Sequence, residues 1–220
     1  MRLVCEYKNY KGVVKWNEFD NIAGNIREFR KLFKPNQNRD LVIICVGTDR
    51  STGDSLGPMV GSYLKATTNL NVYGTLDEPV HAVNMQEILD EVEDKYTNPF
   101  IVGIDASLGR TSSIGRVDVI DKPLKPGTGV GKEHLPPIGE CHIRGIVNTS
   151  GYMEYFVLQS TRLSTIVKLS QEICQIITEV TDEIQRPEPT GGTVVDFEEK
   201  VAACNESNNF ISKVIDMFRN

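Results

Sequence analysis

Asp54 and Asp105 are the residues whose type and position best suit them for chemistry. Each carboxylate follows an apolar run of strand length, residues 41–46 before the first and residues 100–104 before the second. A carboxylate at the end of a buried strand needs a partner, a bound metal or a raised pKa, because burying a charge is costly. Two such carboxylates at one edge of a sheet could share a proton and activate a water molecule. They could also bind a divalent metal that carries the attacking water.

A purely structural role is the alternative for each aspartate. Asp54 lies near the start of an expected helix, where free backbone N–H groups and the helix dipole favour a carboxylate. A capping aspartate would occupy this position equally well. Asp105 could likewise be a buried side chain with a polar partner rather than a reactive group. The residue types alone therefore leave both roles open.

Glycine-bearing loops accompany both aspartates and could form the walls of a cleft. Glycine lets the backbone approach a ligand or a neighbouring loop closely, although residues 125–132 could also be an ordinary surface loop. Residues 47–57 resemble a phosphate-binding loop only loosely, since they contain no Gly-Lys pair and their acidic side chains would repel phosphate. The residues expected to form the cleft are Gly47, Thr48, Asp49, Gly53, Gly57, Ser107, Gly127, Gly129, Gly131 and Lys132.

The elements that must position these residues alternate between strand and helix. Such alternation predicts an α/β fold whose mostly parallel sheet has helices on both faces. Ligands of such folds bind beyond the carboxyl ends of the strands, so the loops after Val46, Ile104 and Ile120 are expected to share one edge. The hydrophobic spacing predicts helices over residues 19–33, 58–66, 82–96 and 163–184, and strands over residues 41–46, 71–76, 99–104, 117–120 and 142–147.

The 220 residues are expected to hold one folded unit. Residues 1–186 are predicted to form a single α/β domain. Residues 187–220 are predicted to be a linker, with Pro and Gly near its start, followed by a short amphipathic helix whose role the sequence leaves open.

Composition limits the partners and the compartment. The formal charge of −6 is spread along the chain without basic blocks, so nucleic acid is not an expected partner. The apolar runs are far shorter than the ~20 residues that a membrane-spanning helix needs, and no signal peptide is recognisable. We therefore expect a cytoplasmic protein with no membrane association. The scattered cysteines argue against a disulfide framework and a structural zinc site, and Cys45 is expected to be a core residue.

Several ordered motifs resemble the YyaC family of sporulation proteins, which occurs in endospore-forming bacteria and is related to the spore germination protease. The resemblance covers about residues 40–170 and is carried by VGTDRSTGDSLGP, PVHAVNMQEI, IDASLG, KPGTGVGKEHLPPIGE and GIVN. The germination protease degrades small acid-soluble spore proteins and is regarded as an atypical aspartic endopeptidase. Its fold is that of the hydrogenase-maturation endopeptidases, so the resemblance implies a three-layer sandwich of the hydrogenase-maturation-protease or phosphorylase/hydrolase-like type.

The resemblance also implies that Asp54 and Asp105 are a catalytic pair. Residues 52–58 are similar to a TPDALGP pattern of the germination protease, and residues 104–108 are similar to its IDALA pattern. A PGxGVGN loop of the same protease is similar to residues 126–132, which would form another wall of the cleft.

Three functions follow as hypotheses. The first is a sporulation-associated endopeptidase in which Asp54 and Asp105 activate water against peptide bonds of spore proteins, with no cofactor. Its substrates would include small acid-soluble spore proteins, and it would act in the forespore or spore interior. The second is a metal-assisted endopeptidase in which Asp54, Asp105 and His81 hold a divalent cation, following the hydrogenase-maturation pattern. The third is a non-catalytic sporulation protein that binds a partner through the acidic cleft. The sequence predicts no oligomeric state.

Overall fold

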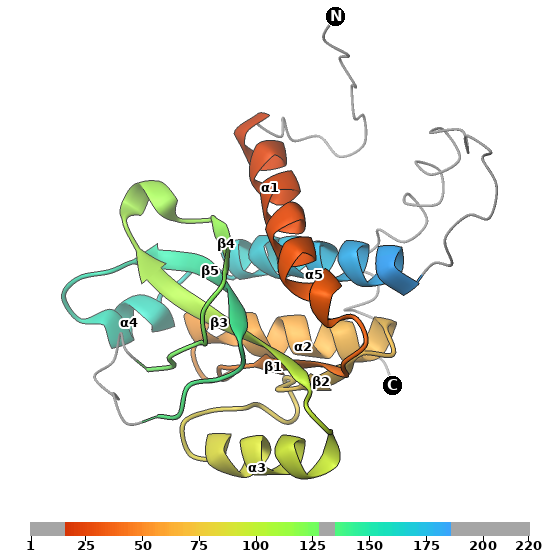
Figure 1. Ribbon diagram of the computed structural model, residues 1–220. Coiled ribbons are helices and arrows are strands. Elements are labelled where there is room, and N and C mark those ends of the chain that lie inside the picture. The colour runs from red at the N-terminus through yellow and green to blue at the C-terminus, as the bar shows by residue number, and fades with distance from the viewer. Residues whose placement is uncertain (1–15, 128–134, 186–220) are drawn as a thin grey trace, which may run out of the picture.

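Five strands form the sheet at the centre of the computed structural model, which describes residues 16–127 and 135–185 (Figure 1). The strand order is β2-β1-β3-β5-β4. The first four of these are parallel neighbours, and β4 pairs with β5 in the antiparallel direction. The mostly parallel sheet predicted from the sequence is therefore confirmed. The strands are β1 (Leu41–Cys45), β2 (Asn71–Tyr73), β3 (Phe100–Gly109), β4 (Val117–Ile120) and β5 (Cys141–Thr149).

Helices cover both faces of the sheet, as predicted, but they do so unequally. Three helices, α1, α2 and α5, pack on one face, whereas α3 lies on the other (Figure 1). A short helix, α4, contacts β5 and the 3₁₀ helix η2. The helices are α1 (Trp16–Phe33), α2 (Leu56–Thr67), α3 (Met85–Lys95), α4 (Glu154–Gln159) and α5 (Leu163–Gln185), with 3₁₀ helices η1 (Lys34–Asn36), η2 (Gly53–Ser55) and η3 (Thr111–Ser113).

Strand β1 contributes to the hydrophobic cores on both faces. Ile43 packs among side chains of α1, α2 and α5, whereas Ile44 packs on the α3 side. A strand buried on both faces needs a continuous apolar run, which is what residues 41–46 provide. Cys45 is fully buried, which confirms it as a core residue. The buried free thiols are Cys45, Cys141 and Cys174, while Cys5 and Cys204 lie outside the described residues.

Strand β3 is longer than the sequence pattern predicted. The apolar run ends at Ile104, but β3 continues to Gly109 because its neighbour β5 continues to pair with it, through a bulge between Ser107 and Leu108. Asp105 therefore lies within a strand rather than in the loop after one. Its neighbour β1 ends with Cys45 opposite Ile104, so Asp105 is the first residue of β3 beyond the end of β1.

The loop after Ile120 lies beside the loops after Val46 and Ile104, as predicted, because residues 122–127 line one cavity with residues 47–48 and 105–108. It reaches this place from an antiparallel strand, which the sequence did not predict. Because β4 is antiparallel, it ends at Ile120, which pairs with His142 near the start of β5 and so lies level with Gly103, two residues before Asp105. The following segment returns along the α3 face of the sheet. There Leu124 bridges Ile138 and covers Gly103, where an added methyl group would lie 2.8 Å from the Leu124 Cβ.

Gly57, in the first turn of α2, brings this helix against the end of β1. A Cβ at residue 57 would lie 2.1 Å from the carbonyl oxygen of Val46, closer than two such atoms can approach. We expect Gly57→Ala to lower the free energy of unfolding by about 1–3 kcal/mol, as overpacking does. The matched control is Gly24→Ala in α1, where no atom lies within 4 Å and alanine should raise stability by about 0.5–1 kcal/mol. Equal denaturant midpoints for the two variants would contradict this assignment.

Two sequence predictions are not decided by these elements. The linker and helix predicted within residues 187–220 lie outside the described residues, so the domain boundary stays a prediction. No helix of the described ranges has the length and apolar character needed to cross a membrane.

Candidate functional site

The loop that carries Asp54 folds back on its own start. The Thr48 N–H donates to the Asp54 carbonyl oxygen (3.1 Å), and the Gly47 N–H donates to the Val80 carbonyl (2.8 Å). Gly47 has φ of +149°, and a Cβ at this position would lie 2.0 Å from the Asp54 carbonyl oxygen. Glycine at residue 47 is thus needed for the close contact that fixes Asp54 at the end of β1.

The structure does not place Asp54 at a helix cap. Asp54 lies inside η2, and the N-cap residue of α2 is Ser55. The cap residue of η2 is Thr52, and neither cap makes a side-chain capping hydrogen bond. The capping alternative therefore gives no account of an aspartate at this position.

Asp54 and Asp105 line one cavity of about 880 Å³ on the α3 face of the sheet. Asp54 enters it from η2, and Asp105 enters it from the part of β3 beyond the end of β1. On this face α3 packs against β1, and Leu124 covers Gly103 of β3. The cavity therefore lies over the later part of β3, from Asp105 onward, and over His142 and Arg144 of β5. The structure thus brings together the two carboxylates that the sequence singled out.

Burial raises the pKa of both carboxyl groups. Although part of residue 105 is exposed, its carboxyl group lies deep enough that burial raises the pKa of Asp105 to about 8. The Ala106 N–H, which donates to Asp105 Oδ1 (2.8 Å), lowers this pKa in part, and the charge of Asp54 raises it. Burial also raises the pKa of Asp54, with a smaller opposing effect from the Ser51 side chain. Near neutral pH burial therefore favours the protonated form of Asp105.

Ser51, whose side chain lowers the pKa of Asp54, is itself buried. The Ser51 side-chain oxygen has no hydrogen-bond partner at full geometry among the described residues. A water molecule or a polar group of a substrate could form hydrogen bonds with the side chains of both Ser51 and Asp54.

The seven predicted cleft-forming residues that the structure describes divide into three groups. Four of them line the cavity, two are packing residues and one is exposed outside it. Gly53 is buried against Leu158, and Gly57 is buried against Val46. Asp49 is exposed and does not line the cavity. The four lining residues are Gly47, Thr48, Ser107 and Gly127, whereas Gly129, Gly131 and Lys132 lie outside the described residues.

His81 lines the same cavity as the two aspartates. Its backbone N–H donates to Asn84 Oδ1 (2.9 Å), which holds the chain at the start of α3. The His81 Nδ1 atom is buried and, among the described residues, has no hydrogen-bond partner. Such an atom is available to a ligand or to water.

The described residues of the site do not provide a complete set of metal ligands. Within residues 16–127 and 135–185, no three His, Cys, Asp or Glu side chains lie close enough to hold a metal ion. The set of Asp54, Asp105 and His81 is therefore not assembled as three ligands. The metal-assisted endopeptidase therefore stays a hypothesis.

Sequence reasoning missed several polar residues of the cavity wall. Arg144 lines it from β5, and its Nη2 atom lies 3.2 Å from Asp118 Oδ2. His142 also lines it, with Nδ1 2.7 Å from the Lys122 carbonyl oxygen, and burial lowers the pKa of this histidine. The alternation of polar and buried residues over 141–144 was the available signal, because it indicates a sheet face with no helix over it. The lining residues with charged side chains that the sequence did not single out are Lys122, Arg144 and Glu154.

These observations define the molecule as a three-layer α/β protein with a carboxylate pair in a cavity at the carboxyl edge of its parallel strands. The chain belongs to the family described as "Protein of unknown function (DUF1256)", whose profile matches residues 15–176.

Two comparisons accompany this assignment. The chain is 51% identical over 139 residues to "Uncharacterized protein YyaC" of Bacillus subtilis, which covers 62% of this chain and 67% of that protein. This confirms the YyaC resemblance that the motifs indicated. Among solved structures, the chain is similar to the [NiFe] hydrogenase maturation protease HycI from Thermococcus kodakarensis. The TM-score is 0.48 with 16% identity, over 70% of this chain and 99% of that one.

Proposed function

We propose that this protein is a sporulation-associated endopeptidase in which Asp54 and Asp105 activate water against a peptide bond. The observation that supports this most is the shared cavity, where burial raises the pKa of Asp105 to about 8 beside a second carboxylate. A pair of carboxyl groups held in different protonation states is the arrangement needed for acid–base catalysis near neutral pH.

The proposed reaction assigns one role to each carboxyl group. Asp54, ionised, accepts a proton from a water molecule as the water oxygen attacks the peptide carbonyl carbon. Asp105, protonated, donates its proton to the carbonyl oxygen, so that the tetrahedral intermediate is a neutral diol. The carbon–nitrogen bond then breaks, Asp54 returns the proton to the leaving amine, and Asp105 recovers its proton from a hydroxyl of the diol. Both carboxyl groups end in their starting state.

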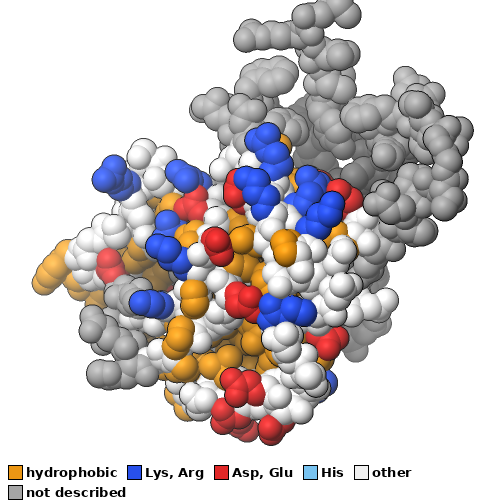
Figure 2. Space-filling model, in the orientation of Figure 1, with side chains coloured by type: hydrophobic (Ala, Val, Ile, Leu, Met, Phe, Trp, Pro, Cys, Tyr) orange, Lys and Arg blue, Asp and Glu red, His pale blue; other side chains and the backbone are white. Residues whose placement is uncertain are grey.

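A polypeptide substrate is favoured by the apolar surface at the cavity mouth. Helix α4 supplies Glu154 and Leu158 to the cavity, and four apolar side chains of α4 and of the turn before it are exposed: Tyr152, Met153, Tyr155 and Phe156. Tyr152 is 91% exposed, and Phe156 is 57% exposed. Hydrophobic atoms protrude in this region, at the left of Figure 2. Clustered apolar side chains at a rim favour contact with another protein surface.

The motif resemblance to the spore germination protease suggests which proteins these are. On that basis the substrates would be proteins of the developing spore, including small acid-soluble spore proteins, and the protein would act in the forespore or spore interior. The same apolar rim also favours the second candidate, a non-catalytic protein that holds a partner over the cavity. Cleavage distinguishes the two.

The direct experiment is to incubate the purified protein with a spore protein extract and to identify new peptide termini by mass spectrometry. Wild-type protein should generate defined new termini, and Asp105→Asn should not. A parallel incubation with a chelator separates the mechanisms, since an aspartate pair should keep its activity and a metal-assisted enzyme should lose it. If wild type and Asp105→Asn yield the same termini, the peptidase proposal is wrong.

A further inference from the structure

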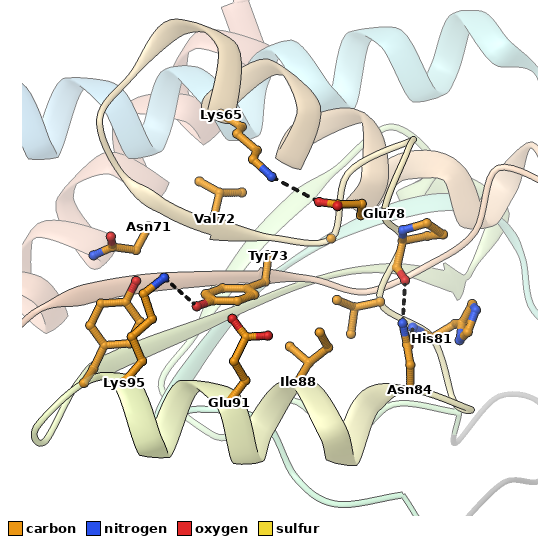
Figure 3. Close-up of a pocket in the computed structure, with 14 residues that line it drawn as sticks. Lys65, Asn71, Val72, Tyr73, Glu78, His81, Asn84, Ile88, Glu91 and Lys95 are labelled. Atoms are coloured by element: carbon orange, nitrogen blue, oxygen red, sulfur yellow. Dashed lines mark hydrogen bonds and ion pairs between the residues drawn. The ribbon is translucent and has the colours of Figure 1, made fainter.

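A second hollow, of about 590 Å³, runs along the edge strand β2 (Figure 3). One wall is α3, which contributes Ile88, Glu91 and Lys95. The opposite side carries Lys65 from α2, and Tyr73 of β2 lies between the two helices. We call this feature the β2 groove.

Strand β2 has one pairing partner among the described strands. It pairs with β1 on its inner side and ends the strand order, so no described strand lies along its outer side. An edge strand presents backbone N–H and C=O groups that can pair with another extended chain. Binding of this kind draws its affinity from main-chain hydrogen bonds and its selectivity from pockets for alternate side chains.

The walls of the β2 groove suit an amphipathic chain rather than a single charge. Lys65 pairs with Glu78 (3.2 Å) on one side. On the other side, Lys95 Nζ lies 3.3 Å from the Tyr73 hydroxyl and 5.2 Å from the ring centre of Tyr96. The groove is thus lined by two lysines and two glutamates around aromatic and aliphatic side chains. Because these charges balance, we expect recognition to depend mainly on the backbone of the ligand.

The β2 groove leads to the aspartate cavity. His81 lines both hollows, and its buried Nδ1 atom has no hydrogen-bond partner among the described residues. Val80 bridges Val46 in the parallel direction, which places this segment at the carboxyl edge beside the Asp54 loop. A chain leaving the groove at this end would therefore pass His81 before it reaches the two carboxylates.

We propose that a short extended stretch of a polypeptide substrate adds to the outer edge of β2, which no described strand occupies, between α2 and α3, and continues past His81 into the aspartate cavity. This inference rests on the proposed peptidase function for its occupant. Because β2 spans only three residues, the paired stretch of substrate is short. Since the pairing uses main-chain groups, it requires the substrate to be extended and does not require a particular sequence.

Hydrogen–deuterium exchange tests the pairing. The probe is reduced, carboxymethylated α-lactalbumin, a permanently unfolded polypeptide, added to full-length Asp105→Asn protein so that it stays intact. Probe at saturation should slow exchange of the amides of residues 71–74 at least tenfold and leave those of α5 unchanged. Bound probe without protection at residues 71–74, or no binding at millimolar probe, would overturn the proposal.

A blocking variant provides the second measurement. Glu91→Trp places a large side chain over the groove from α3, while the control Glu93→Trp alters an exposed residue of the same helix that does not line it. With both melting curves near that of the parent, Glu91→Trp should bind the labelled probe at least tenfold more weakly than Glu93→Trp, as measured by fluorescence anisotropy. Equal affinities would refute the assignment of the groove.

The outcomes also separate this inference from the proposed function. If wild type cleaves spore proteins but residues 71–74 are never protected, the groove assignment is wrong and the peptidase proposal stands. If residues 71–74 are protected and Glu91→Trp weakens binding, but wild type produces no new termini, the groove assignment stands and the peptidase proposal is wrong.

Discussion

Replacing either Asp54 or Asp105 by asparagine should reduce the rate of peptide cleavage by about 10²–10⁴-fold, the usual contribution of a positioned acid or base. Asparagine keeps the size of the side chain and its hydrogen-bonding oxygen while removing the ionisable group. At residue 105 it can still accept the bond from the Ala106 N–H, whose present length is 2.8 Å. The loss should therefore be chemical rather than structural, with wild-type circular dichroism for both variants.

The double variant distinguishes a catalytic pair from two independent residues. If Asp54 and Asp105 serve one step, the double variant should be hardly slower than either single variant, since residues that act as a unit are strongly non-additive. Multiplicative losses would indicate separate roles. The matched control is Asp49→Asn, in the same loop as Asp54 but exposed and outside the cavity. This control should cleave at the wild-type rate, and a comparable loss there would contradict the assignment of the site.

Much of the sheet could be predicted because its strands are locally encoded. Residues 41–46 and 100–104 are unbroken apolar runs, as strands covered on both faces must be. The end of β3 could not be found in this way. Residues 105–109 have no hydrophobic pattern of their own, and they are strand because β5 pairs with them through a bulge. Pairing between residues about 40 positions apart leaves no local signal at Asp105.

The direction of β4 was likewise beyond local reasoning. Residues 117–120 read as a strand of either direction, and the antiparallel choice is set by pairing with β5. The return of the next segment along the α3 face, with Leu124 over Gly103, then supplies a cavity wall that a purely parallel topology would not have. The two aspartates were found because each adjoins a strongly encoded strand, whereas Arg144 was missed because its role depends on which sheet face lacks a helix.

Stability should respond to pH through Asp105, with a defined sign. The pKa of Asp105 in the folded state is about 8, whereas the pKa of an aspartate in an unfolded chain is ~3.9. Below pH ~3.9 Asp105 is protonated in both the folded and the unfolded state, so it adds no pH dependence to the free energy of unfolding. Between the two values the folded state binds more protons than the unfolded state, and the free energy of unfolding should fall by up to about 1.4 kcal/mol per pH unit. Above about pH 8 both states are ionised, and the loss is complete and constant.

Asp105→Asn removes this titration, so its advantage over wild type should grow as the pH rises. We expect similar melting temperatures at pH 4 and a higher melting temperature for Asp105→Asn at pH 8.5, by an amount equivalent to several kcal/mol, because burying an ionised carboxylate is costly. Asp54→Asn should show a smaller advantage, since Asp54 is half-buried and its removal also withdraws the charge that raises the pKa of Asp105. The measurement is thermal unfolding of the three proteins from pH 4 to pH 9 at constant ionic strength. Parallel curves for wild type and Asp105→Asn would mean that residue 105 ionises normally in the folded state, and the proposed acid would then carry no proton at neutral pH.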